Sequence, residues 1–288
     1  MAKKFIRIAL SILALVLVAI WVEIARSPSD DNVHLYFFDV GQGDAAMITK
    51  GDYQILIDGG PDDTGMSEIG KVMPLSDRKI EKVILTHPHA DHLVGLVQVL
   101  EHYEIGEIYI SGVAHTSNQY LEFLSKIKDK NILTIVPEIN QKEIPFDNGS
   151  LTFLWPGKKY QEQTAENLNN SSIINKFCYY SQCALFTGDI ETDEQNLMLS
   201  ENKSVDFQAQ ILKIAHHGSN NGTNQALLDK VKPQYAVISA GADNKYGHPH
   251  AATLDLLDKS GTKLFRTDRD GTVEFVLSQN DITVKTGL

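Results

Sequence analysis

An apolar run that ends in a cluster of histidines constrains this chain more than any other feature of its sequence. Residues 82–87 (KVILTH) have the branched, apolar content of a buried strand. Residues 91–103 (DHLVGLVQVLEHY) repeat apolar side chains at helical spacing. Four polar residues cluster where the first stretch ends and the second begins: His87, His89, Asp91 and His92. Imidazoles and a carboxylate do not build an apolar core, so we predict a strand-to-helix turn that carries a functional site.

Strands and helices alternate along the rest of the chain. In the first half we predict strands over 34–40, 44–49, 54–60, 105–111 and 132–137, and a helix over 117–129. In the second half we predict strands over 151–156, 172–180, 183–190, 209–218 and 235–241, and helices over 191–199, 224–231 and 251–260. Two strand-rich halves that each carry helices predict an α/β sandwich in one domain, with two sheets face to face and helices outside. We place this domain at residues 33–288.

The N-terminus predicts a membrane segment. Three positive residues precede a continuous apolar run over residues 8–22: Lys3, Lys4 and Arg7. The run is long for a signal-peptide core and short for a membrane span, but its apolar flanks extend it, and no A-x-A cleavage site follows. We therefore predict an uncleaved single-pass anchor over 1–25 and a polar linker over 26–32, with a cleaved signal peptide as the alternative. Both place the domain outside the cytoplasmic membrane, because positive residues stay on the cytoplasmic side.

The charge balance limits what the surface can bind. The formal net charge is −11 at pH 7. This argues against a broad basic surface for nucleic acid, since such binding depends on Lys and Arg that neutralise phosphates. It does not exclude a metal site that acts on a phosphodiester, because a bound cation inverts the local charge.

The chain has two cysteines, Cys178 and Cys183. Two cysteines supply neither a disulfide framework nor a cysteine zinc cluster. We place both on one hairpin, diagonal to each other rather than opposite, and expect two buried thiols rather than a bridge.

The His and Asp residues at strand ends predict a metal site. Imidazole suits zinc and iron, and carboxylate suits harder ions such as manganese. His87 and His89 can converge on one ion, while Asp91 and His92 on the first helical turn reach a second. Asp189 ends an apolar strand and can bridge two ions. A further strand ends in a pair of candidate residues, His216 and His217.

These motifs resemble a known family. His87-x-His89-x-Asp91-His92 resembles the signature of the metallo-β-lactamase superfamily, whose fold is an αββα sandwich. Eight blocks, in the same order, resemble the extracellular hydrolase domain of ComEC-type DNA-uptake competence proteins: residues 37–48, 55–60, 85–96, 169–174, 185–190, 212–219, 238–249 and 266–275. The resemblance covers roughly residues 33–280.

The resemblance implies roles for individual residues. The metal-ligand positions are His87, His89, Asp91, His92, Asp189 and His217, with His217 preferred to His216. Asp58 would orient ligands from behind rather than bind metal. Catalytic roles are expected for Asp91, His216 and His248, of which His248 is open to metal ligation, phosphate contact or acid catalysis. Substrate contacts are expected from Gln42, Asp44, Asn170, Asn244, Lys245 and Tyr246, for which loop-forming roles are the alternative.

Two departures from the family pattern leave the number of ions open. Most of the superfamily has a further His some twenty residues before the bridging aspartate, where this chain has Asn169, Asn170 and Ser171. That replacement favours a single ion. In the other direction, ComEC-type domains often carry Asp where this chain has His89. The histidine matches the wider superfamily and favours two ions.

The expected function is a membrane-anchored, metal-dependent hydrolase that faces outward and uses one or two divalent ions, zinc or manganese. The resemblance implies a phosphodiesterase or nuclease acting on DNA, with single-stranded DNA as substrate. With at most one span the chain cannot itself translocate DNA, so a separate channel protein is an expected partner. The alternatives are a hydrolase of envelope phosphoesters or other esters and lactones, and a non-catalytic DNA- or polymer-binding module.

Overall fold

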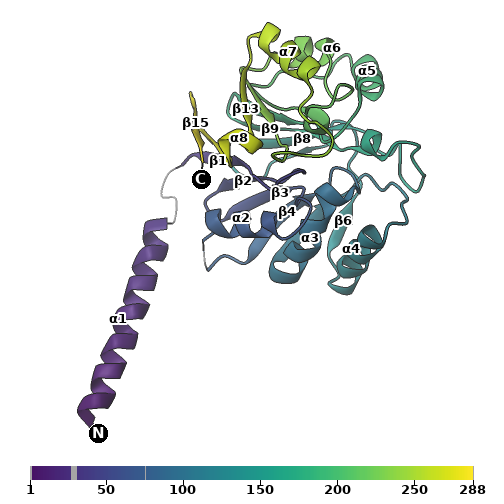
Figure 1. Cartoon of the computed structure of the whole chain (residues 1–288). Helices are drawn as coiled ribbons and strands as arrows, with labels where there is room; N and C mark the ends of the chain where they lie inside the picture. The colour runs from purple at the N-terminus through teal and green to yellow at the C-terminus, as the bar shows by residue number, and fades with distance from the viewer. Residues whose placement is uncertain (1, 27–30, 75, 288) are drawn as a thin grey trace.

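The main body of the protein is a sandwich of two β-sheets with helices on both outer sides (Figure 1). The structure is a computed structural model of the whole chain and describes residues 2–26, 31–74 and 76–287. The arrangement confirms the predicted α/β sandwich preceded by an apolar N-terminal helix.

The first sheet has the strand order β15-β14-β1-β2-β3-β4-β5-β6. Its strands are β1 (Val33–Phe37), β2 (Ala46–Lys50), β3 (Tyr53–Ile57), β4 (Lys79–Ile84), β5 (Glu104–Tyr109), β6 (Leu133–Ile135), β14 (Val273–Leu277) and β15 (Ile282–Thr286). Lys50 pairs with Tyr53, so Gly51 and Asp52 form the predicted hairpin turn. Strands β3 to β6 run parallel to one another.

The second sheet has the strand order β13-β12-β11-β10-β9-β8-β7. Its strands are β7 (Lys142–Glu143), β8 (Gly149–Trp155), β9 (Ile174–Tyr179), β10 (Gln182–Phe186), β11 (Ile211–Lys213), β12 (Tyr235–Ile238) and β13 (Lys263–Arg266). Strands β10 to β13 run parallel to one another. Each sheet therefore has a parallel half whose carboxyl ends lie at one edge.

The helices divide between the two outer faces. The helices of the body are α2 (Thr64–Val72), α3 (Ala90–His102), α4 (Asn118–Asp129), α5 (Thr192–Glu201), α6 (Gln225–Val231), α7 (Ala251–Ser260), the short α8 (Thr267–Asp270), and the 3-10 turns η1 (Leu168–Ser171) and η2 (Ala215–Gly218). Helices α2, α3 and α4 lie on the side of the first sheet, and α5, α6 and α7 on the side of the second (Figure 1).

Alternating burial along the strands explains the layers. In β1 the side chains of Val33, Leu35 and Phe37 are buried, and the residues between them are only partly so. Phe37 joins Phe177 in the core between the sheets. Burial of each such side chain contributes about 1.5–3 kcal/mol, which makes this inner layer the main stabilising contact between the two sheets.

The N-terminal helix α1 (Ala2–Arg26) extends away from the sandwich (Figure 1). Residues 3–22 have a mean hydropathy of 2.7, and none of this window is buried within the protein. By length and composition it can cross a membrane, and a signal sequence meets the same criteria. The predicted linker over 26–32 falls largely on residues 27–30, which lie outside the described residues.

The expectation of two buried thiols was wrong. Cys178 and Cys183 form a disulfide, and neither residue is fully buried. The hairpin turns through two residues, so Cys183 lies directly opposite Cys178 rather than diagonal to it. Their Cα atoms are 4.1 Å apart, which is close to the spacing of a directly opposed, non-hydrogen-bonded antiparallel pair.

Candidate metal centre

The predicted site residues gather where parallel strands of the two sheets end. In the first sheet, Asp58 follows β3 and His87 comes shortly after the parallel strand β4. In the second sheet, Asp189 and His217 come shortly after the parallel strands β10 and β11. Because these ends lie at one edge of the sandwich, residues far apart in the sequence converge there.

Four of the predicted ligands form one cluster with a donor atom each within 4.8 Å of the others: Asp91, His92, Asp189 and His217. Oδ2 of Asp189 lies 3.3 Å from Nε2 of His92 and 3.3 Å from Nε2 of His217. Nε2 of His217 lies 3.2 Å from Oδ2 of Asp91. Ligands about 2.0–2.1 Å from a tetrahedral cation are separated by about 3.3 Å, so these spacings fit a zinc-sized ion.

Two atoms of this cluster have no hydrogen-bond partner among the described residues. They are Nε2 of His92 and Oδ1 of Asp189, and both are fully buried. Leaving a buried polar atom unpaired costs about 1–3 kcal/mol. A buried imidazole nitrogen and a buried carboxylate oxygen without partners, within a group of His and Asp side chains, are what a cation-binding site looks like without its ion.

His87 and His89 lie beside this cluster as a pair. Nε2 of His87 is 3.0 Å from Nδ1 of His89, and the ring of His87 lies 4.2 Å from that of His92. The structure thus brings all six predicted ligands together, with four in the compact set and two next to it.

Asp58 lies behind the cluster and fixes the orientation of His92. Its Oδ2 accepts a 2.8 Å hydrogen bond from Nδ1 of His92, which turns Nε2 toward Asp189. Its two oxygens also accept hydrogen bonds from the backbone N and the hydroxyl of Thr86, at 2.8 and 2.7 Å. A carboxylate that binds the far nitrogen of a ligand histidine sets its tautomer and direction.

Three residues of the site have left-handed backbone conformations: Asp58, His216 and His217, with φ of 59°, 51° and 53°. Such conformations cost about 1–3 kcal/mol each in residues other than glycine. Nδ1 of His217 donates to the carbonyl of Ser239 at 2.9 Å, which helps to hold this geometry.

The electrostatics divide the histidines into two groups. Burial disfavours charge on His92 and His217, but the nearby carboxylates, led by Asp189, outweigh it and raise the pKa of both well above the ordinary value. Burial lowers the pKa of His87 and His89, and the charge on His92 lowers it further. Without a cation, protons on His92 and His217 compensate the clustered carboxylates.

Asp44 and Lys213 form a buried ion pair directly behind the cluster. Asp44 was expected at the mouth of the site, but its Oδ1 lies 3.3 Å from Nδ1 of His217, on the side away from Asp189. Although burial by itself would raise the pKa of Asp44, the charges of Lys213 and His217 hold it below its usual range. The sequence analysis did not single out Lys213. The feature that could have revealed it is a charged residue at the end of the otherwise apolar strand β11.

A cleft of about 320 Å³ opens over the cluster. Predicted site residues that line it are Gln42, His89, Asp91, Asp189, His216, His217, Tyr246 and His248. Burial, together with the charges of His217 and His216, lowers the pKa of His248 to about 4. Its imidazole is therefore neutral at neutral pH.

The remaining predicted substrate contacts are engaged in loop structure. Asn244 donates to the carbonyls of Gly241 and His248 and accepts from the backbone N of Tyr246 and His248. Lys245 is exposed, with its ammonium 5.0 Å from the centre of the Tyr246 ring.

Asn170 also bonds to the backbone: its Oδ1 accepts from the backbone N of Glu191 at 3.1 Å. Sequence reasoning did not single out Glu191, whose carboxylate lies 3.7 Å from Nδ1 of His216.

Comparison with known families identifies the superfamily to which the chain belongs. The model of the metallo-beta-lactamase superfamily matches residues 38–242. This chain belongs to that superfamily. The superfamily comprises metal-dependent hydrolases that bind divalent metals, in agreement with the His and Asp cluster.

Individual relatives confirm the resemblance to ComEC-type proteins. ComE operon protein 3 of Bacillus subtilis (strain 168) is 27% identical over 206 residues, which are 69% of this chain and 25% of that protein. Competence protein ComA of Neisseria gonorrhoeae is 25% identical over 248 residues, 85% of this chain and 32% of that protein. This chain thus spans a quarter to a third of the length of these relatives. Among solved structures, the metallo-beta-lactamase fold protein YhfI of Bacillus subtilis aligns with a TM-score of 0.54 at 12% identity, covering 88% of this chain and 99% of that one.

Asn169 stands in the region where most of the superfamily has a further histidine. Its Nδ2 donates to Glu191 at 3.0 Å and lies 3.5 Å from Nε2 of His216. The amide of Asn169 therefore lies beside His216, where a further imidazole is absent.

Close backbone contacts between glycines hold the metal-bearing turn of this superfamily member. A Cβ on Gly95 in α3 would lie 1.9 Å from the carbonyl oxygen of Gly59, directly after Asp58. The backbone N of Gly59 donates to the carbonyl of His92 at 2.7 Å. Only glycine at position 95 lets α3 approach so closely that Asp58 can reach His92.

The Gly95→Ala variant should be destabilised by about 1–3 kcal/mol, since an added methyl forces the backbones apart. For a domain of this size that lowers Tm by roughly 2–4 °C per kcal/mol, measurable by circular dichroism. Gly70→Ala in α2 is the matched control, because a Cβ there meets nothing within 4 Å. Equal Tm values for the two variants would contradict the packing argument.

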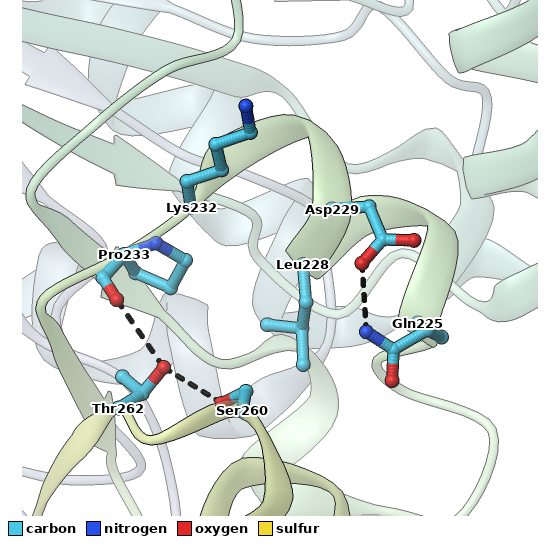
Figure 2. Close-up of a pocket in the computed structure, with 7 residues that line it drawn as sticks. All are labelled: Gln225, Leu228, Asp229, Lys232, Pro233, Ser260 and Thr262. Carbon is cyan, nitrogen blue, oxygen red and sulfur yellow. Dashed lines mark hydrogen bonds between the residues drawn. The ribbon is translucent and has the colours of Figure 1, made fainter.

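A second cavity is lined by α6, the residues that follow it, and the end of α7 (Figure 2). Within it, the side chain of Gln225 donates to Asp229, and the hydroxyl of Thr262 donates to the backbone carbonyl of Pro233. None of the predicted site residues lines it. We assign it no role in the chemistry of the site.

Proposed function

We propose that this chain is an outward-facing, metal-dependent phosphodiesterase that cleaves single-stranded DNA. The observation that carries the proposal is the cluster of Asp91, His92, Asp189 and His217, whose donor atoms have the spacing of a cation site and open into a cleft. The named relatives support the substrate, because one of them is a competence protein.

The location is supported by two features. Helix α1 has the length and hydropathy of a membrane span, with positive residues at its start. The disulfide between Cys178 and Cys183 favours an oxidising compartment, since cytosolic thiols are kept reduced. We propose that the sandwich lies outside the cytoplasmic membrane and that it works beside a separate channel protein.

The protein's own residues would hold the substrate and the cation. Asp91, His92, Asp189 and His217 would ligate a zinc or manganese ion, with His87 and His89 as ligands for a second and weaker one. Such a cation supplies a Lewis acid for the phosphoryl oxygens and brings the pKa of water close to 7. Asp58 keeps Nε2 of His92 directed at the site, and the Asp44–Lys213 pair closes it from behind.

Two histidines that face the cleft would move protons: His216 would donate to the leaving oxygen, whereas His248, neutral at neutral pH, would accept a proton. His216 and His248 both line the cleft, and their ring centres lie 5.6 Å apart. The carboxylate of Glu191 lies 3.7 Å from Nδ1 of His216 and places negative charge beside it. General acid–base catalysis by a positioned side chain typically contributes 10²–10⁴-fold, so each histidine accounts for at most a part of the rate.

The test uses the full chain in detergent, stripped of metal and then supplied with Mn²⁺ or Zn²⁺. Single-stranded DNA, bis(p-nitrophenyl) phosphate and a lactone are offered in parallel, and the same preparation with excess chelator is the control. We expect metal-dependent cleavage of DNA and of the small diester. If the chain cleaves the small diester but not DNA, its substrate is instead a small-molecule or envelope phosphoester. Turnover of the lactone alone, or binding of DNA without any turnover, would overturn the phosphodiesterase proposal.

A further inference from the structure

The loop after β12 carries an aromatic side chain at the rim of the metal cleft. Tyr246 is 54% exposed and lines the cleft together with His248. The two rings are stacked, with centres 5.7 Å apart and planes inclined by 21°. His248 in turn stacks on His217, with ring centres 6.2 Å apart. The Tyr246 ring is thus the outer member of a stack that ends at the metal cluster.

Hydrogen bonds fix the position of this loop. Asn244 makes four hydrogen bonds within it. Oε1 of Gln42 accepts from the backbone N of Gly241 at 3.1 Å, which ties the start of the loop to the first sheet. The backbone N of His250 donates to the carbonyl of Gly218 at 2.9 Å, which ties its end to the His216–His217 turn. A preorganised aromatic face loses little conformational freedom when a ligand stacks on it.

The surroundings of the ring point to a planar group joined to an anion. Lys245, next in sequence, is exposed and places its ammonium 5.0 Å from the centre of the ring. A planar ligand that stacks on Tyr246 takes the place of this ammonium over the ring, and the long, exposed lysine side chain can then turn its charge toward the ligand's negatively charged neighbour. The chain as a whole carries a formal net charge of −11, so this positive charge is a local feature. Next to a stacking surface, it favours binding of a nucleobase that carries a phosphate over binding of an anion alone.

We propose that Tyr246 is a stacking platform for the nucleobase adjacent to the phosphate that is cleaved. The substrate would then be single-stranded nucleic acid, whose bases are free to stack, rather than a base-free phosphodiester or a duplex. The inference rests on the proposed phosphodiesterase function.

The test compares an oligonucleotide, an abasic oligonucleotide of the same length and bis(p-nitrophenyl) phosphate, with the metal-loaded full chain in detergent. Stacking on an aromatic side chain is worth about 1–3 kcal/mol per base, which corresponds to about 5- to 150-fold. Tyr246→Ala should raise KM for the oligonucleotide by that factor and change kcat less, and Tyr246→Phe should restore KM. The abasic substrate should have a high KM that Tyr246→Ala does not raise further.

Tyr180→Ala is the matched control, because Tyr180 is 41% exposed and lies at the hairpin before β10, at the opposite end of that strand from Asp189. If Tyr246→Ala impairs the base-bearing and abasic substrates equally, or neither, the stacking role is wrong. If the wild-type chain cleaves none of the substrates, the phosphodiesterase function fails instead. In that case fluorescence anisotropy measures how tightly the same oligonucleotides bind. The stacking role requires that binding weakens both when the bases are removed and when Tyr246 is replaced by Ala.

Discussion

The Asp189→Asn variant should hydrolyse phosphodiesters more than about 100-fold more slowly than the wild-type chain at saturating Mn²⁺ or Zn²⁺. Loss of a residue that merely supports a metal ligand typically costs 10–100-fold in affinity or activity, and Asp189 contacts two candidate ligands directly. Asparagine keeps the shape of the side chain but removes the charge opposite His92 and His217. Initial rates over a range of metal concentrations measure the loss.

Asp206→Asn is the matched control for this substitution. Asp206 also pairs with a cation, the ammonium of Lys176 at 3.1 Å, but its side chain is largely exposed and precedes β11 rather than following it. We expect its rate to stay close to that of the wild-type chain. An Asp189→Asn variant that retains its bound metal and works within tenfold of the wild type would show that the cluster is not the reaction centre.

Metal should stabilise the fold strongly. At a free cation concentration one hundred times its Kd, the free energy of unfolding should rise by about 2.7 kcal/mol. For a domain of this size the corresponding rise in Tm is roughly 5–10 °C. At a fixed cation concentration the gain should be larger at pH 8 than at pH 6. The pKa values of His92 and His217 are raised in the cation-free protein, so the cation must displace protons, and their displacement costs more free energy at lower pH.

Scanning calorimetry of the metal-stripped chain at both pH values measures this effect. His217→Gln should abolish most of the metal-induced rise in Tm. His102→Gln should retain it, because His102 is exposed in the last turn of α3 and bonds only locally, at 2.9 Å from the carbonyl of Gln98. A rise that is equal in the two variants, or that grows as the pH falls, would place the cation elsewhere.

The sequence predicted the features that depend on local patterns. Strands β1 to β6 and helices α3, α4 and α7 lie where periodicity placed them. The six predicted ligands converge because they stand at strand ends or in the first helical turn after one, as the sequence placed them. The N-terminal apolar helix also needs only its composition to be found.

The features that were missed depend on tertiary contacts. Helix α2 contains Gly65 and Gly70, poor helix formers, and its position depends on packing against Gly59. Strand β15 is a largely exposed edge strand, and its side chains give little alternation of polarity to detect.

The hairpin register and the position of Asp44 were missed for the same reason. A shift of one residue in the register decides whether Cys178 faces Cys183, and no periodic pattern fixes that shift. Asp44 follows a glycine-rich turn whose path is set by its ion pair with Lys213 across the sandwich.

The division of the cluster between the two sheets has a consequence for when activity can arise. Asp91 and His92 belong to the first half of the chain, and Asp189 and His217 to the second. The half that is synthesised first holds only part of a binding site, so a nascent or truncated chain has no complete set of donors. A complete donor set therefore forms only when both halves have folded and joined.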